Sequence, residues 1–145
     1  MKAVFTTLTL LYILPVFAQQ NEEAAIRNCI NQFFKGMYEA DTAMIRSACT
    51  EEVIFQTITN NRNNKVRQES FAGFLQSIAS LQKGDADEKI QYQSILIDGD
   101  LAHVWTPYEF YYKGRLSHTG VNSFQLVKTG EGWKVVYVID TRKRN

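Results

Sequence analysis

Three consecutive segments near the C-terminus decide the fold: LAHVWTPYEFYY (101–112), LSHTGVNSFQLVK (116–128) and WKVVYVIDT (133–141). Aromatic and β-branched residues fill each segment, a composition typical of β-strands. Short glycine-containing stretches join the segments. The pattern predicts a meander of antiparallel hairpins.

The segments upstream of this meander include three predicted helices. Apolar residues recur at three- and four-residue steps over 22–38 and again over 70–81, which predicts two amphipathic helices. Asp41 is placed to cap a shorter helix between them. Glu22 and Glu23 are expected in the first turn of the first helix, where the helix dipole favours acidic side chains.

Further strands are expected at 52–58 and at 89–97, with a polar loop or exposed hairpin at 60–68. The predicted order is helix, helix, strand, helix and then four antiparallel strands, which indicates an α+β fold. A strongly twisted sheet curls, so helices packed on its concave side leave a cone with an open mouth. Such a mouth is a usual place for a small ligand.

The first eighteen residues have the features of a secretory signal peptide. Lys2 gives a positive start, the run 3–14 is mostly apolar, and small residues precede a cleavage point after Ala18. We therefore expect residues 1–18 to be removed and 19–145 to form one domain. The mature protein would begin near Gln19, be exported to the periplasm or secreted, and have no membrane anchor.

The composition excludes some classes of partner. Hydrophobic residues make up 45% and charged residues 21% of the 145 residues, as in ordinary globular proteins. The net charge of +1 gives no field that would attract nucleic acid. Outside the cytoplasm Cys29 and Cys49 could form a disulfide, but two buried thiols are the simpler expectation because Cys29 falls on an apolar helix face.

The chain resembles the nuclear-transport-factor-2-like superfamily, and within it the putative lumazine-binding family of bacterial proteins. The resemblance lies in WTPYEF (105–110), SHTGVNSF (117–124), GWKV (132–135) and DTR (140–142). It implies a cone-shaped fold with three N-terminal helices packed on a curved antiparallel sheet. It also implies a cavity and a homodimer formed through the sheet, but no particular reaction.

Alternation along the strands indicates which polar residues face the cavity. His118 and Asn122 share a face with apolar neighbours, and Tyr108 on the preceding strand is expected opposite them. Asp140 and Arg142, two residues apart, would form an ion pair at the mouth or meet an anionic ligand. We predict that Tyr108, His118, Asn122 and Arg142 bind the ligand, and that His118 or Asp140 is the candidate general base. The alternative for His118 is a structural histidine bonded within the core.

Three functions are compatible with these residues: an exported small-molecule-binding protein, an enzyme of the isomerase, cyclase or dehydratase type, and a non-catalytic protein-interaction module. The sequence contains no nucleophile elbow, phosphate loop, zinc spacing or dinucleotide fingerprint. We therefore expect no metal and no cofactor, and a binding role before a catalytic one.

Overall fold

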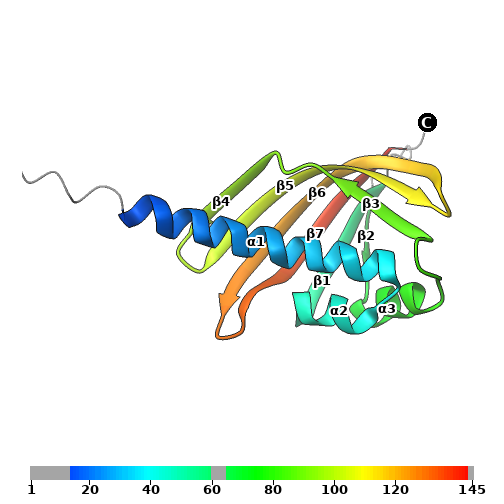
Figure 1. Cartoon of the computed structure of the whole chain (residues 1–145). Helices are drawn as coiled ribbons and strands as arrows, with labels where there is room; N and C mark the ends of the chain where they lie inside the picture. Colours follow the sequence, from blue (N-terminus) through cyan, green and yellow to red (C-terminus); the bar gives the residue numbers. More distant parts are fainter. Residues whose placement is uncertain (1–13, 60–64, 144–145) are drawn as a thin grey trace, which may run out of the picture.

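The computed structural model describes residues 14–59 and 65–143 and shows three helices packed on one curved sheet (Figure 1). In chain order the elements are α1 (Leu14–Glu39), α2 (Thr42–Ala48), β1 (Cys49–Thr59), β2 (Val66–Glu69), α3 (Phe71–Ala79), β3 (Ala86–Ile90), β4 (Ser94–Asp98), β5 (Leu101–Tyr112), β6 (Arg115–Thr129) and β7 (Gly132–Lys143). The predicted α+β class and cone-shaped arrangement are confirmed.

The sheet is ordered β2-β1-β7-β6-β5-β3, with β4 pairing with β5 beyond the end of β3. The meander of β5, β6 and β7 is antiparallel, as predicted. The return strand β2 pairs with β1 and so confirms the exposed hairpin. The expectation of a wholly antiparallel sheet is wrong in one place, because β1 pairs in parallel with β7.

The predicted strand at 89–97 is two strands, β3 and β4, which both pair with β5. Ile90 pairs with Tyr108, and Ser94 pairs with Trp105. Residues 91–93 therefore lie opposite only two residues of β5, 106 and 107. Such a bulge interrupts the ladder. Pro107 lies opposite the gap, where its nitrogen has no hydrogen to donate.

The helix ends are set by local hydrogen bonds. The Asp41 carboxylate accepts from the Met44 amide at 3.0 Å, and the Ser70 hydroxyl accepts from the Gly73 amide at 3.1 Å, so both predicted caps are confirmed. The prediction for Glu22 is wrong, because α1 begins eight residues earlier, at Leu14. Glu22 instead accepts a hydrogen bond from the indole of Trp133 at 2.8 Å.

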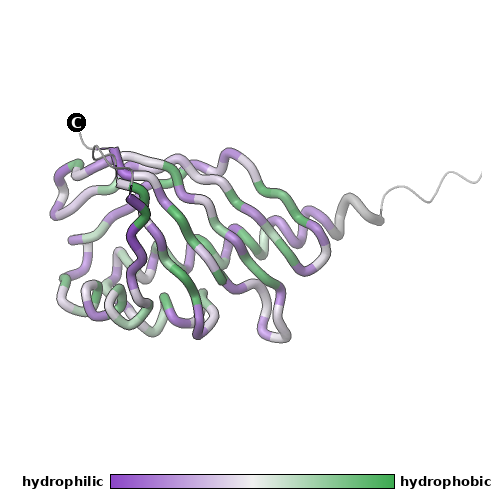
Figure 2. The backbone as a smooth tube through the Cα atoms, turned by 180° about the vertical axis from the view of Figure 1, so that it is seen from behind, coloured by the Kyte–Doolittle hydropathy of each residue, from purple (hydrophilic) through white to green (hydrophobic). Residues whose placement is uncertain are grey.

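The core lies between α1, α3 and the concave face of the sheet. Hydrophobic residues concentrate on the strands (Figure 2). Phe124 and Val104 from the sheet and Ile26 and Ile30 from α1 are among the fully buried side chains. This layer attaches the long first helix to the strands that carry the polar residues described below.

Some predictions fall at the margins of the described residues. Residues 1–13 of the predicted signal peptide and residues 60–64 lie outside them. The predicted cleavage point after Ala18 falls near the start of α1 and stays a prediction. No helix in the described ranges is both long and apolar enough to cross a membrane.

Candidate functional site

A pocket of about 410 Å³ opens between the sheet, α1 and α3. One wall is aromatic and is formed by Phe33, Phe34, Phe55, Phe74, Phe110 and Phe124. Within it the rings of Phe33 and Phe74 stack with centroids 5.8 Å apart. Such a surface accepts a flat apolar body, because offset stacking and burial both favour it.

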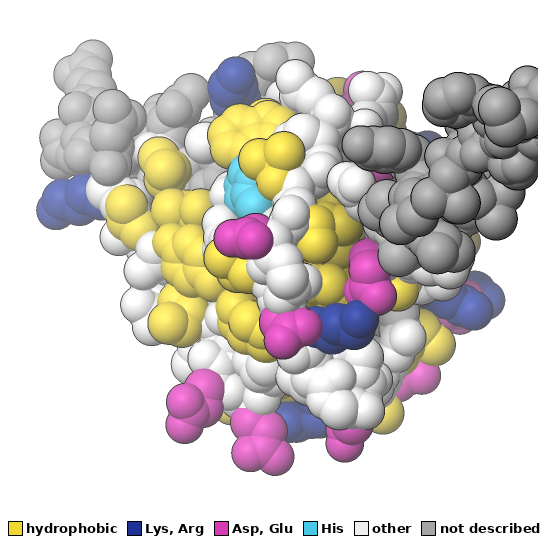
Figure 3. Space-filling model, turned by 90° about the vertical axis from the view of Figure 1, so that its left-hand side faces the viewer, with side chains coloured by type: hydrophobic (Ala, Val, Ile, Leu, Met, Phe, Trp, Pro, Cys, Tyr) yellow, Lys and Arg dark blue, Asp and Glu magenta, His cyan; other side chains and the backbone are white. Residues whose placement is uncertain are grey.

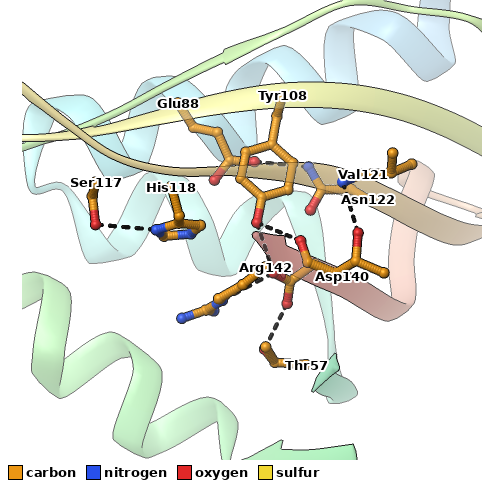
Figure 4. A network of polar contacts seen from close by, with 10 residues as sticks. Thr57, Glu88, Tyr108, Ser117, His118, Val121, Asn122, Asp140 and Arg142 are labelled. Carbon is orange, nitrogen blue, oxygen red and sulfur yellow. Dashed lines mark hydrogen bonds and ion pairs between the residues drawn. The ribbon is translucent and has the colours of Figure 1, made fainter. Parts of the chain in front are cut away.

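The polar side chains of the pocket come from neighbouring strands of the sheet (Figure 4), which also carries Phe55, Phe110 and Phe124. All five residues singled out from the sequence line this one pocket: Tyr108 on β5, His118 and Asn122 on β6, and Asp140 and Arg142 on β7. Tyr108, His118, Asn122 and Asp140 are buried, while the Arg142 side chain is partly exposed at the mouth. The structure therefore brings the predicted residues together.

Asp140 is the centre of one hydrogen-bond network. Its Oδ2 accepts from the Tyr108 hydroxyl at 2.9 Å and from Arg142 Nε at 2.9 Å, and its Oδ1 accepts from the Thr57 hydroxyl at 2.5 Å. Tyr108 also donates to the Thr141 carbonyl at 3.0 Å. The ion pair expected from the spacing of Asp140 and Arg142 is thus formed.

The network alters the acidity of its members. Burial and the neighbouring Asp140 charge raise the pKa of Tyr108, so its hydroxyl stays protonated and donates. Burial opposes the charge of Arg142, but the Asp140 carboxylate outweighs that effect and raises the pKa of Arg142. Arg142 therefore keeps its positive charge, and its bond to Asp140 lies in the pocket lining.

Tyr108 reaches this network because the strand between β5 and β7 carries a glycine. Gly120 pairs with Tyr108 on one side and with Arg142 on the other. A Cβ added at Gly120 would lie 1.8 Å from the Thr141 carbonyl oxygen and 2.9 Å from Tyr108 Cε1. The missing side chain gives the tyrosine room to cross β6.

A further carboxyl, Glu88 on β3, lines the pocket and was missed by sequence reasoning. Its Oε1 accepts a hydrogen bond from Asn122 Nδ2 at 2.7 Å. Burial raises the pKa of Glu88 to about 8, against the opposing effect of the Asn122 hydrogen bond and with a contribution from the Asp140 charge. The alternation Ala86, Glu88, Ile90 contained the signal, since it places an acid between two inward apolar residues.

His118 lies at the same wall, between aromatic rings. Its ring centroid is 5.0 Å from that of Phe110 and 5.7 Å from that of Tyr108, and its Nδ1 lies 3.1 Å from the Ser117 hydroxyl. His103, by contrast, is half-buried on the outer face beside Ser123.

Outside the pocket, Trp133 is buried and packs in the core. Cys29 and Cys49 are buried free thiols, which matches the simpler of the two alternatives. Among the described residues no group of three or more histidine, cysteine or acidic side chains is arranged to hold a metal ion.

Comparisons with known proteins agree with this architecture. The model of a family described as "Putative lumazine-binding" matches residues 21–138. None of the curated proteins matches the chain.

Solved structures show the same fold at low sequence identity. A protein of unknown function from Shewanella baltica, described as NTF2-like, is 19% identical with a TM-score of 0.68, over 87% of this chain and 97% of its own. An NTF2-like protein with a cystatin-like fold from Novosphingobium aromaticivorans is 13% identical with a TM-score of 0.67, over 94% and 92%. A conserved protein from Planctomyces limnophilus is 15% identical with a TM-score of 0.68, over 87% and 99%. These similarities show that the chain has the NTF2-like, cystatin-like fold, and the family match over most of the sequence shows that the chain belongs to the putative lumazine-binding family.

Proposed function

We propose that this is an exported protein that binds a small molecule in the pocket between the curved sheet, α1 and α3. The observation that carries the proposal is an open cavity of about 410 Å³ that is lined by six phenylalanines and by several converging polar side chains. Ligand sites commonly combine an apolar surface with a few convergent polar groups. The signal-peptide pattern in residues 1–18 supports export.

The two walls suggest the shape of the ligand. A flat body would stack on the phenylalanine wall, and its polar edge would meet Tyr108, His118, Asn122 and Arg142. The description of the family, which refers to lumazine, supports a flat heterocyclic body. Fold alone does not distinguish binding from catalysis, so the proposal rests on the pocket.

The pocket can be tested by blocking it from α3. Ser77 lines the pocket, whereas its exposed neighbour Gln76 does not. We would purify the mature protein from its source under native conditions, with Ser77→Trp and Gln76→Trp as a matched pair, and record native mass spectra. A small molecule retained by the wild type and by Gln76→Trp but lost from Ser77→Trp is the expected result. Equal retention by all three proteins would contradict the proposal.

One observation favours a second function, acid–base catalysis in the same pocket. Glu88, with a pKa of about 8, could exchange a proton near neutral pH, beside the candidates His118 and Asp140. Isomerase, cyclase and dehydratase reactions all need such a group. Incubating the retained small molecule with the protein in D₂O tests this: deuterium incorporated at carbon by the wild type but not by Glu88→Gln would favour an enzyme.

We also propose that two copies pair through the outer face of the sheet. Large apolar side chains are exposed there, with Leu96 64%, Trp105 39% and Ile54 40% exposed. Hydrophobic side chains also gather on the side of the molecule that Figure 3 shows, next to acidic and basic ones. Light scattering coupled to size exclusion should give a dimer for the wild type and a monomer for Trp105→Lys. Ala79→Lys, at an exposed position on α3 away from the sheet, should stay dimeric. A monomeric wild type would leave this face to a different protein partner.

A further inference from the structure

We propose that the pocket selects ligands in which a protonated amine is attached to the flat body, and that Glu88 pairs with this amine. The inference rests on the proposed function and names the ligand class of the same pocket. It follows from the charges that line the pocket, from the way each charge is already bonded, and from the aromatic surface beside Glu88.

The described pocket lining carries more acids than bases. The carboxyls are Glu69, Glu88 and Asp140, and the basic groups are Arg142 and His118. Arg142 Nε is bonded to Asp140 at 2.9 Å, so these two charges largely neutralise each other. A ligand anion would therefore find Arg142 already paired with Asp140, whereas a ligand cation could pair with a carboxyl of the lining.

Glu88 is the carboxyl that suits an incoming cation. The hydrogen bond it accepts comes from Asn122, a neutral amide, at 2.7 Å. The charges that act on it are those of Asp140 and Arg142, which are paired with each other. A half-buried carboxylate in such a pocket is unfavourable unless a positive group joins it. In the free protein a proton fills that role, because burial raises the pKa of Glu88 to about 8.

The surroundings of Glu88 favour a cation over a neutral group. Phe110 is its partner on the neighbouring strand β5 and lines the same pocket. Aromatic faces attract ammonium groups when water is excluded. An amine bound at Glu88 would thus displace the proton to solvent and replace it with a charge pair, while the ligand body stacks on the remaining phenylalanines.

Three probes with one shared body test the proposal: naphthylmethylamine, naphthylmethanol and naphthoate. Their affinities for the mature protein would be measured by titration calorimetry between pH 6 and pH 9, in buffers of different ionisation enthalpy. We expect the amine to bind most tightly. Its affinity should rise about tenfold per pH unit below pH 8 and level off above, because one proton leaves Glu88 on binding. About one proton should therefore be released per amine bound near pH 7.

Two variants locate the effect. Glu88→Gln keeps the size of the side chain and an oxygen for Asn122, so it should bind naphthylmethanol as the wild type does but lose the preference for the amine and the proton release. Asp87→Asn removes the neighbouring carboxyl on β3, which does not line the pocket, and should keep both.

The outcomes separate this inference from the proposed function. Three results would each overturn the amine proposal while the pocket remained a binding site. They are tighter binding of naphthylmethanol or naphthoate than of the amine, binding of the amine without proton release, and an unchanged preference for the amine in Glu88→Gln. A protein that bound none of the three probes and retained no molecule in native mass spectra would refute both.

Discussion

Tyr108 on β5 contacts Gly120 on β6 so closely that a single added carbon at Gly120 would lie 2.9 Å from the tyrosine ring. The tyrosine ring occupies this space, and its hydroxyl donates a hydrogen bond to Asp140 on β7, two strands away. The polar wall of the pocket thus depends on a residue that has no side chain.

The first prediction concerns this glycine. Gly120→Ala should lower the free energy of unfolding by about 3 kcal/mol, because the new Cβ would overlap the Thr141 carbonyl and force β7 to shift. Urea unfolding measures the change. Gly130→Ala is the matched control, since a Cβ there meets nothing within 4 Å, and it should change stability by less than about 0.5 kcal/mol. Equal effects of the two substitutions would contradict the close packing.

The second prediction concerns the Tyr108 hydroxyl. Tyr108→Phe should destabilise the protein by about 1–2 kcal/mol, because the Thr141 carbonyl and Asp140 lose a buried donor. Tyr112→Phe provides the comparison, since the side chain of Tyr112 is exposed on the same strand. Two variants of equal stability would show that the buried hydrogen bonds contribute nothing.

The third prediction concerns pH and Glu88. The pKa of Glu88 is about 8 in the folded protein and lies near its ordinary value of about 4.3 in the unfolded chain. The folded state therefore binds the extra proton between these values, so its contribution to stability is full below about pH 4.3 and is lost as pH rises to about 8.

Glu88→Gln removes this dependence. The stability of the wild type relative to Glu88→Gln should fall by up to about 1 kcal/mol per pH unit between pH 5 and pH 8, and then level off. Urea unfolding of both proteins across this range gives the difference at each pH. A difference that stays constant from pH 5 to pH 8 would place the Glu88 carboxyl in a solvated environment.

The fourth prediction concerns the two cysteines. Burial raises the pKa of Cys29 to about 11 and that of Cys49 to about 12, so both thiols stay protonated at neutral pH. Thiol reagents should label neither residue in the folded protein and both in denaturant. Failure to label in denaturant without a reductant would reveal a disulfide, which the folded structure lacks.

The fifth prediction concerns the N-terminus. If residues 1–18 are a signal peptide, the protein recovered outside the cytoplasm should begin at Gln19, and replacing Ala18 with a bulky residue should cause the precursor to accumulate. Intact mass measurement distinguishes the two forms. Full-length protein in the cytoplasm alone would refute export.

The inward-facing residues of the meander could be predicted from the sequence because side chains alternate along a strand. Alternation predicted that Tyr108, His118 and Asn122 face inward, and all three line the pocket. Alternation fails where a β-bulge shifts the register between two paired strands. Val135 and Val138 lie three positions apart, so a regular strand would point them to opposite faces, yet both are buried. The cause is a register shift between Gln125 and Leu126 on the partner strand β6.

Glu88 shows what local patterns miss. The predicted strand at 89–97 starts one residue after Glu88, so the alternation of Ala86, Glu88 and Ile90 was not recognised as one inward face. The hydrogen-bond partner of Glu88, Asn122, lies 34 residues further along the chain. Alternation can therefore mark the acid as inward, but the contact with Asn122 depends on the tertiary arrangement and has no signal in local periodicity.

The parallel pairing of β1 with β7 has a consequence for how the chain reaches its native state. Thr57 and Asp140, which face each other across this pairing, are separated by 83 positions. Most of the polypeptide must therefore be synthesised before β1 can pair with β7. Contacts of such long sequence separation slow folding. A ribosome-bound fragment that ends before β7 would lack the Asp140 network, so the pocket is among the last parts of the molecule to be completed.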